Sequence, residues 1–387
     1  MTVFSKIFII VVTFIFNITS VIASNTDGLS AAKSGDLVNI NPSLIIEEIP
    51  ALKIHNTVIE GPQLLLSNKP EYFFSGNGIA MQEIVRPGTI RLYIYHVPTP
   101  DNQFHTISAV IENIGVEELY FRFLKYSFQK PGNNYRKIGQ NGLISFFDSK
   151  PDNNIRTISP GKTMVIDPTL DAFKVTNNQL VHGFYEFEIN QPAIVTIFQR
   201  STEKASTEII NYLEKLPREA PNIRSSGAGR GLFTSSNINV TAINLFDTKD
   251  GIHKIVVADG KSDPWVEGFD SISNKKSLNI GNYGVMYTIQ FKWKSSNGQK
   301  LAILFTNGRS NDKKCKHAAG AIQIGNISKN LHTIALPPGS FTLNNLPQAA
   351  VIDTLSQENT EEIHTVNLTY SPPGGSCLPT PILLLPY

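Results

Sequence analysis

Hydrophobic and polar side chains alternate with a period of two along much of the chain. Residues 289–294 read Ile-Gln-Phe-Lys-Trp-Lys, so the apolar side chains fall on one face of an extended segment. This alternation is typical of an antiparallel strand with one buried face. The turn-forming sequence 295–298 follows, and apolar residues return on alternate positions from Leu301 to Phe305. We therefore predict a β-hairpin over 287–305.

The first half of the chain carries a similar unit. Apolar residues alternate over 107–111, the turn sequence 113–115 follows, and a second strand begins at Leu119. The alternation in this second strand then changes phase, so that from Leu124 onward the other face is apolar. Such a change of phase predicts a β-bulge or a strand that bends between two sheets.

Proline-glycine turns that precede apolar strands recur in both halves, at 158–161 and 336–339. We predict an all-β (mainly β) fold with two tandem β-sandwich domains and one short α-helix between or beside them. The first sandwich is expected to cover 41–200 and the second 232–387, after a flexible lead-in at 24–40.

One segment departs from the β pattern. Residues 201–216 carry apolar side chains at helical spacing, and Pro217 ends the pattern. Because 217–231 is rich in Pro, Gly and Ser, we predict that 201–231 forms a helix and a linker between the sandwiches. The helix could instead pack beneath the first sandwich. The glycines of 227–231 lack the GxGxxG spacing of a dinucleotide-binding loop, and we interpret them as part of the linker.

The beginning of the chain has the pattern of a secretory signal peptide. Lys6 precedes the apolar segment 7–16, and Ala23 offers a cleavage site, so residues 1–23 are predicted to be removed on export. An uncleaved membrane anchor is the alternative, although the apolar segment is short for a span. We expect no transmembrane segment after cleavage, and a secreted, periplasmic or cell-surface location.

The chain has two cysteines, Cys315 and Cys377. In an oxidising compartment such a pair usually forms a disulfide, so we predict a bond between them. Two buried free thiols are the alternative. The two cysteines lack the CxxC spacing of a zinc site.

Composition and charge exclude several classes of protein. The 34 Lys and Arg side chains nearly balance the 32 Asp and Glu side chains, which argues against a nucleic-acid partner. With 41% hydrophobic residues the chain is not intrinsically disordered. No HxH, HExxH or GxSxG motif occurs. We therefore assign no catalytic, metal-binding or cofactor-binding residue, and no cofactor.

Trp265 lies in a predicted loop within the acidic segment 247–270. An exposed loop tryptophan can stack on a sugar ring, which makes Trp265 a candidate ligand contact. A tryptophan folded over the end of a sandwich is the alternative. We interpret the carboxylates of this segment as solvated turn residues, with calcium binding as the alternative.

Short segments spread over most of the chain give a resemblance to a known family. These segments are 88–96 with the turn at Asn113, 183–187, 281–285, 336–339 and 370–373. Through them the chain resembles an exported family, known mainly from cyanobacteria, called domain of unknown function 3370. The resemblance implies an exported, β-rich protein, and it implies no activity or catalytic residue.

The expected function is that of an exported, non-catalytic binding or structural module of the envelope or the extracellular space. Its expected partner is a polysaccharide or another envelope protein. A secreted carbohydrate-active enzyme, with carboxylates drawn from separate loops, is one alternative. An adhesin-like surface assembly subunit is another. The sequence leaves the oligomeric state open.

Overall fold

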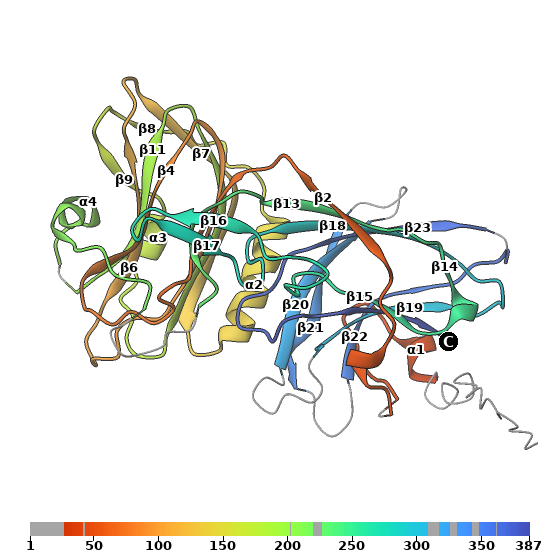
Figure 1. The fold of residues 1–387 in the computed structure, drawn as a ribbon. Helices are drawn as coiled ribbons and strands as arrows, with labels where there is room; N and C mark the ends of the chain where they lie inside the picture. Colours follow the sequence, from red (N-terminus) through yellow and green to blue (C-terminus); the bar gives the residue numbers. More distant parts are fainter. Residues whose placement is uncertain are drawn as a thin grey trace, which may run out of the picture.

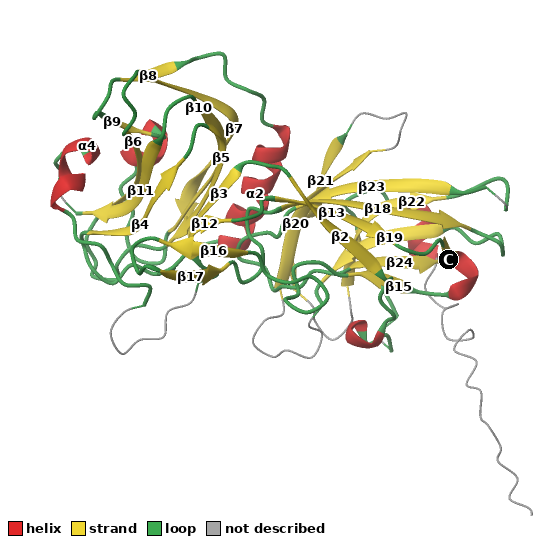
Figure 2. Ribbon diagram, turned by 45° about the horizontal axis from the view of Figure 1, so that its top comes forward, coloured by secondary structure: helices red, strands yellow, loops and turns green. Residues whose placement is uncertain are grey.

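The computed structural model describes residues 27–41, 43–201, 203–219, 227–308, 317–325, 331–342, 348–360 and 362–387. The fold is mainly β, which confirms the predicted class. Two β-sandwiches lie side by side, and helix α2 (Tyr135–Asp148) stands between them (Figures 1 and 2).

The first sandwich, on the left in Figure 1, packs an eight-stranded sheet against a four-stranded sheet. The larger sheet contains, in spatial order, β17 (Lys275–Leu278), β16 (Glu267–Asp270), β12 (Arg230–Phe233), β3 (Gln63–Ser67), β5 (Gly88–His96), β10 (Leu180–Ile189), β7 (Leu119–Gly132) and β8 (Arg156–Ile158). The smaller sheet contains β4 (Gly78–Val85), β11 (Ala193–Arg200), β6 (Thr106–Asn113) and β9 (Thr163–Val165). Two short helices, α3 (Pro168–Ala172) and α4 (Ser206–Ile209), lie beside the smaller sheet.

The second sandwich packs a seven-stranded sheet against a five-stranded sheet. The larger sheet contains β2 (Ile54–Ile59), β13 (Asn237–Ala242), β18 (Met286–Lys294), β23 (His364–Tyr370), β20 (His317–Gly325) and β21 (His332–Thr342), with β14 (Phe246–Asp247) also paired to β18. The smaller sheet contains β1 (Leu37–Asn39), β22 (Gln348–Leu355), β19 (Leu301–Thr306), β24 (Ile382–Pro386) and β15 (His253–Ile255).

Two segments cross between the sandwiches, as the orange and teal ribbons of Figure 1 show. Strands β1 and β2, from the N-terminal part of the chain, belong to the sheets of the second sandwich. Strands β12, β16 and β17, from later in the chain, belong to the large sheet of the first sandwich. The sheets therefore do not follow the predicted ranges 41–200 and 232–387. Backbone hydrogen bonds can join strands that are far apart in the sequence. A domain boundary predicted from local composition therefore does not show which strands are exchanged between the two sandwiches.

The segment predicted as a flexible lead-in is ordered from residue 27 onward. Strand β1 forms one edge of the five-stranded sheet, and helix α1 (Asp27–Ala31) and a 3₁₀ turn at Ile46–Glu48 cover the outer face of this sheet. Leu29, Ile40 and Ile46 bury their side chains there against apolar residues of β19, β22 and β24. This part of the prediction was wrong because its few apolar residues have a partner surface that the local sequence does not reveal.

Both predicted hairpins have the right strands but the wrong pairing. Strand β18 pairs with β13 and β23, whereas β19 lies in the other sheet of the same sandwich. Strands β6 and β7 are likewise in different sheets. Alternation shows which face of a strand is buried but not which strand lies beside it.

The change of phase in the sequence of β7 is a β-bulge, as predicted. Glu186 of β10 pairs with Lys125, and the next residue, Phe187, pairs with Phe123. Leu124 is therefore the extra residue, and it transfers the apolar pattern from one face of the strand to the other.

The helices differ from the prediction. The segment predicted as a helix over 201–216 contains only α4 and a 3₁₀ turn at Ile210–Tyr212. The longest helix, α2, was not predicted, because Gly139 and Gly142 lower its intrinsic helix propensity. A Cβ at Gly139 would lie 2.0 Å from the carbonyl oxygen of Gly374, so these glycines permit close packing on both sides of the helix.

The central strands β3, β5 and β10 of the large sheet of the first sandwich are buried on both faces. Leu92 and Ile94 of β5 face the four-stranded sheet, whereas Tyr93 and Tyr95 face α2 and the second sandwich. The Phe146 ring of α2 stacks on a phenylalanine of β10 on that second face. One continuous apolar core therefore joins the first sandwich, α2 and the second sandwich.

The glycine-rich sequence 227–231 is not a linker. Gly231 pairs with Leu66 of β3 and precedes Leu232, which pairs with Phe269 of β16, and Gly231 has a φ of +124°. A Cβ at Gly231 would lie 2.0 Å from the carbonyl oxygen of Phe269, so only glycine lets the two strands approach this closely.

Substituting Gly231→Ala is expected to destabilise the protein more than Gly88→Ala does. Both glycines have a φ of +124°, but a Cβ at Gly88 would meet no atom within 4 Å. The strain of a positive φ is common to both variants. The difference between their free energies of unfolding therefore measures the steric overlap at Gly231, which should cost about 2 kcal/mol. Urea unfolding of the two variants measures it, and equal losses would contradict the packing of β12.

Candidate functional site

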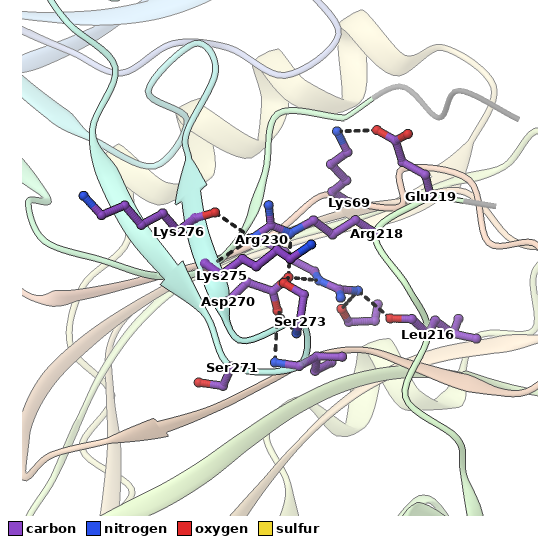
Figure 3. Close-up of polar contacts among 12 residues, drawn as sticks. Lys69, Leu216, Arg218, Glu219, Arg230, Asp270, Ser271, Ser273, Lys275 and Lys276 are labelled. Atoms are coloured by element: carbon purple, nitrogen blue, oxygen red, sulfur yellow. Dashed lines mark hydrogen bonds and ion pairs between the residues drawn. The ribbon is translucent and has the colours of Figure 1, made fainter. Parts of the chain in front are cut away.

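A buried ionic cluster fixes the β16–β17 hairpin on the first sandwich (Figure 3). The Asp270 carboxylate accepts hydrogen bonds from Nε of Arg230 (2.9 Å), Nε of Arg218 (2.7 Å) and Oγ of Ser273 (2.7 Å). Burial by itself would raise the pKa of Asp270, but these hydrogen bonds outweigh it and hold the pKa below its usual value. The carboxylate is therefore an ionised structural group.

Arg230 extends the cluster into the centre of the sandwich. Its side chain has no solvent exposure, and Nη1 donates to the carbonyl oxygens of Ala80 (2.8 Å) and Leu216 (2.9 Å). Burial lowers the pKa of Arg230, and the adjacent Asp270 opposes this shift. The ion pair is thus enclosed and joins β12, β4 and the segment after α4.

The acidic segment 247–270 supplies other structural contacts. The Asp263 carboxylate accepts from Nδ2 of Asn56, the hydroxyl of Tyr287 and the backbone N–H of Ala258, each at 2.6 Å. Burial raises the pKa of Asp263. Within the described ranges no group of three or more His, Cys, Asp or Glu side chains could hold a metal ion.

Trp265, the candidate ligand contact, is half-buried beside the loop of Gly260. A Cβ at Gly260 would lie 2.5 Å from the indole ring, so the tryptophan covers this glycine closely. Its Nε1 atom is buried and has no hydrogen-bond partner in the part of the chain that the structure describes.

Of the two cysteines, Cys377 is buried, and its Sγ accepts a hydrogen bond from the N–H of His317 at 3.3 Å. Cys315 lies outside the described residues. The disulfide therefore stays a prediction, and the described residues include no free cysteine.

A tyrosine-lined cavity lies where the two sandwiches meet, and we call it the tyrosine cavity. Its volume is about 330 Å³. Five segments line it, namely the loop after β3, strand β5, the residues before β12, the β17–β18 loop and the β23–β24 loop. The lining residues are Asn68, Glu71, Tyr93, Tyr95, Gly227, Ala228, Ile280, Tyr283, Gly375 and Ser376.

The floor of the tyrosine cavity consists of buried side chains that pack against one another. Tyr93 and Tyr95 stand two residues apart on the same face of β5 and are almost completely buried. The ring of Tyr93 lies with its centroid 5.9 Å from that of Tyr283 and 5.0 Å from that of His182. Asn68 closes the floor, because its Nδ2 donates to the carbonyl oxygen of Tyr95 at 3.0 Å.

The rim is more open than the floor. Glu71 and Tyr283 are half-buried there, while Ile280 and Gly375 are exposed. Gly375 has a φ of +74°, and a Cβ on it would lie 2.8 Å from the backbone of Tyr135. The rim therefore combines one carboxyl group, one aromatic ring and one apolar side chain.

The phenols of the cavity floor are neutral hydrogen-bonding groups. Burial raises the pKa of Tyr93 and of Tyr95 well above the usual value, and the negative charge of Glu71 acts in the same direction. Neither hydroxyl ionises at physiological pH. The hydroxyl of Tyr93 has no hydrogen-bond partner among the described residues.

Two buried histidines flank this floor. Nδ1 of His96 donates to the carbonyl oxygen of Pro70 at 2.8 Å, so Nε2 accepts from the hydroxyl of Ser67 at 2.7 Å. Nδ1 of His182 donates to the carbonyl oxygen of Ile94 at 2.8 Å. Burial lowers the pKa of each histidine to about 4, so both rings are neutral. The His182 ring packs against Tyr93 and Tyr95, whereas the His96 ring packs against Phe73.

None of the cavity tyrosines was singled out from the sequence. The signal that could have found two of them is the run 88–96, which places Tyr93 and Tyr95 on one face of a strand. The remaining lining residues come from four loops that are far apart in the sequence. The predicted contact, Trp265, is not among the lining residues.

Comparisons with known proteins do not assign the chain to a family. No family model matches it, and no curated protein matches it. The chain is similar at 9% identity to the CUB1-EGF-CUB2 domain of human MASP-1/3, over 79% of this chain and 100% of that one, with a TM-score of 0.17. It is similar at 14% identity to the tandem CBM22-1-CBM22-2 domain of Paenibacillus barcinonensis Xyn10C, over 92% and 98%, with a TM-score of 0.16. These TM-scores are too low to support an argument about function.

In the described ranges no helix is both long and apolar enough to span a membrane.

Asp270→Asn is expected to lower the free energy of unfolding by about 3–5 kcal/mol, because Arg230 would keep a buried charge without its counter-ion. The control is Glu267→Gln, which breaks an exposed ion pair with Lys276 (3.9 Å) and should cost at most about 0.5 kcal/mol. Urea unfolding measures both. Similar small losses would show that the cluster does not hold the hairpin.

Stability should fall as the pH is lowered from about 6.5 to about 4. In the unfolded chain a histidine binds a proton below pH ~6.5, whereas His96 and His182 in the folded protein bind one only near pH 4. The unfolded state therefore binds more protons across this window, and each histidine contributes a slope of about 1.4 kcal/mol per pH unit. Glu83 and Asp263, whose pKa values are raised by burial, partly offset this slope.

Urea unfolding at several pH values between 4 and 7 measures the slope. His182→Asn keeps a donor for the Ile94 carbonyl oxygen and should flatten it, whereas His332→Asn, at an exposed position, should not. An unchanged slope in His182→Asn would rule out this histidine as its source.

Proposed function

We propose that the protein is an exported, non-catalytic β-sandwich binding module whose ligand site is the tyrosine cavity. The observation that carries the proposal is a cavity of about 330 Å³ with a buried, aromatic floor and a partly exposed rim. Ligand sites in proteins are typically concave, mostly apolar and provided with a few fixed polar groups.

A saccharide is the ligand class that this lining fits. The face of Tyr283 on the rim can stack on a sugar ring, and the neutral phenol groups below it can exchange hydrogen bonds with sugar hydroxyls. The proposed natural partner is therefore a polysaccharide of the envelope or of the surroundings.

The cavity supports binding better than hydrolysis. Glycoside hydrolysis commonly uses two carboxyl groups roughly 5–10 Å apart. Glu71 is the one carboxyl group among the described residues that line the tyrosine cavity. The alternative of a secreted carbohydrate-active enzyme would need a second carboxyl group at this place.

The proposed location is the periplasm, the cell surface or the extracellular space. The signal-peptide pattern of residues 1–23 and the predicted disulfide between Cys315 and Cys377 support it. Membership of the exported family that the chain resembles is part of the same proposal.

A glycan array probed with the purified protein tests the proposed function. We expect binding to one class of saccharide, and Tyr283→Ala should weaken it at least about tenfold, since loss of a stacked ring costs on the order of 1 kcal/mol and the hydrophobic contact adds to this. Trp265→Ala is the control and should leave binding unchanged, because Trp265 does not line the cavity.

Thermal unfolding of both variants should show that they remain folded. A blank array would overturn the proposal. Loss of binding in Trp265→Ala, with Tyr283→Ala unaffected, would place the ligand site elsewhere.

A further inference from the structure

Tyr93 differs from the other tyrosines of the core. Four tyrosine side chains are fully buried within the described ranges. Tyr185 donates to Asp167 at 2.7 Å, Tyr287 donates to Asp263 at 2.6 Å, and the hydroxyl of Tyr370 is hydrogen-bonded to Thr380. Only the hydroxyl of Tyr93 has no partner there. Native proteins rarely leave a buried hydroxyl unsatisfied, so an unpartnered one calls for a specific reason.

The position of this hydroxyl provides that reason. Tyr93 lines the tyrosine cavity, and its hydroxyl lies against the β23–β24 loop, which lines the cavity through Gly375 and Ser376. A Cβ at Gly374 would lie 2.6 Å from the hydroxyl oxygen of Tyr93 and 2.8 Å from the ring of Tyr95. Glycine at 374 therefore lets the Tyr93 hydroxyl lie directly against this loop, where the side chain of any other residue would overlap it.

The neighbouring polar groups are already used within the protein. The Asn68 side chain donates to the carbonyl oxygen of Tyr95 and accepts from the N–H of Ala228. The Ser376 hydroxyl donates to the carbonyl oxygen of Ala319 at 2.6 Å and accepts from its N–H at 2.9 Å. The Tyr93 hydroxyl differs from these groups, because it is buried and has no hydrogen-bond partner among the described residues.

Size and charge restrict the ligand further. A volume of about 330 Å³ is at the lower end for small-molecule sites, and loops from both sandwiches surround it. Such a site holds the end of a glycan chain rather than an internal stretch. None of the described residues that line the cavity is Lys, Arg or His, and Glu71 places negative charge at the rim, so a carboxylated or sulfated sugar is disfavoured.

We infer that the tyrosine cavity binds the terminal residue of a non-acidic glycan, and that the hydroxyl of Tyr93 is the specificity-determining group that hydrogen-bonds it. This inference rests on the proposed function, and it adds the ligand class and the residue that selects it. In the ligand-bound protein, the hydroxyl of Tyr93 acquires the partner that the protein itself does not provide.

Tyr93→Phe tests the role of the hydroxyl, because it removes one oxygen and keeps the ring. The probes are cellotetraose, xylotetraose and chitotetraose as neutral glycans and tetragalacturonate as an acidic one, with binding measured by calorimetry. For the neutral glycan that the wild type binds, we expect about a tenfold or greater loss of affinity in Tyr93→Phe. Its melting temperature should be unchanged or higher, because no hydrogen bond within the described protein is lost.

Tyr185→Phe is the matched control. Its hydroxyl is bonded to Asp167, so this variant should melt at a lower temperature while its affinity for the glycan stays unchanged. A lower melting temperature in Tyr93→Phe, or an unchanged affinity, would overturn the role of Tyr93. If Tyr283→Ala still weakened binding, the proposed function would stand.

Two further outcomes test the ligand class. A disaccharide should bind nearly as tightly as the matching tetrasaccharide, and an affinity that rises steadily with chain length would overturn recognition of a chain end. Tighter binding of tetragalacturonate than of every neutral probe would overturn the preference for a non-acidic glycan. If none of the neutral probes bound the wild type, the inference would fail, whereas the glycan array decides the proposed function.

Discussion

The large sheet of the first sandwich has to bury side chains on both of its faces, and the arrangement of the whole molecule depends on this. Leu92 and Ile94 of β5 close the core of the first sandwich, while Tyr93 and Tyr95 on the opposite face need a second cover. Helix α2 and the strands of the second sandwich provide it. Because apolar burial is the main favourable term in folding, the two sandwiches are held together by the same effect that holds each of them.

The sequence predicted the mainly β class, several strands and their buried faces, since period-two alternation is a local signal. It predicted the bulge at Leu124 for the same reason. It did not predict that β18 and β19 lie in different sheets, or that β1 and β2 belong to the second sandwich, because pairing depends on distant surfaces. Helix α2 was not predicted, because tertiary packing stabilises it in spite of its poor intrinsic helix propensity. Of the cavity, the sequence shows only that Tyr93 and Tyr95 share a face, and Trp265, the predicted contact, lies outside the lining.

The buried ionic cluster and the tyrosine cavity are connected through one hairpin. Asp270 and Arg230 hold β16, and β17 follows it directly, so the loop after β17 is placed by the same contacts. That loop carries Ile280 and Tyr283 to the rim of the cavity. An enclosed ion pair is weak evidence for stability by itself, and its geometric effect here is to fix the position of a loop. The cavity thus combines a floor made by one strand with a rim that depends on a charge pair in the sandwich interior.

The crossing of segments between the sandwiches has a consequence for the order in which the protein can fold. Leu37 of β1 pairs with Ala350 of β22, so β1 can form its backbone hydrogen bonds only after β22 has been synthesised. Contacts of such large sequence separation slow folding, because the entropy of closing the loop is lost before the contact is gained. The five-stranded sheet cannot be completed before β24 (Ile382–Pro386) has been synthesised. Every strand of the first sandwich lies between Gln63 and Leu278, so the two sheets of that sandwich can pair earlier, and the second sandwich is the part whose folding is delayed.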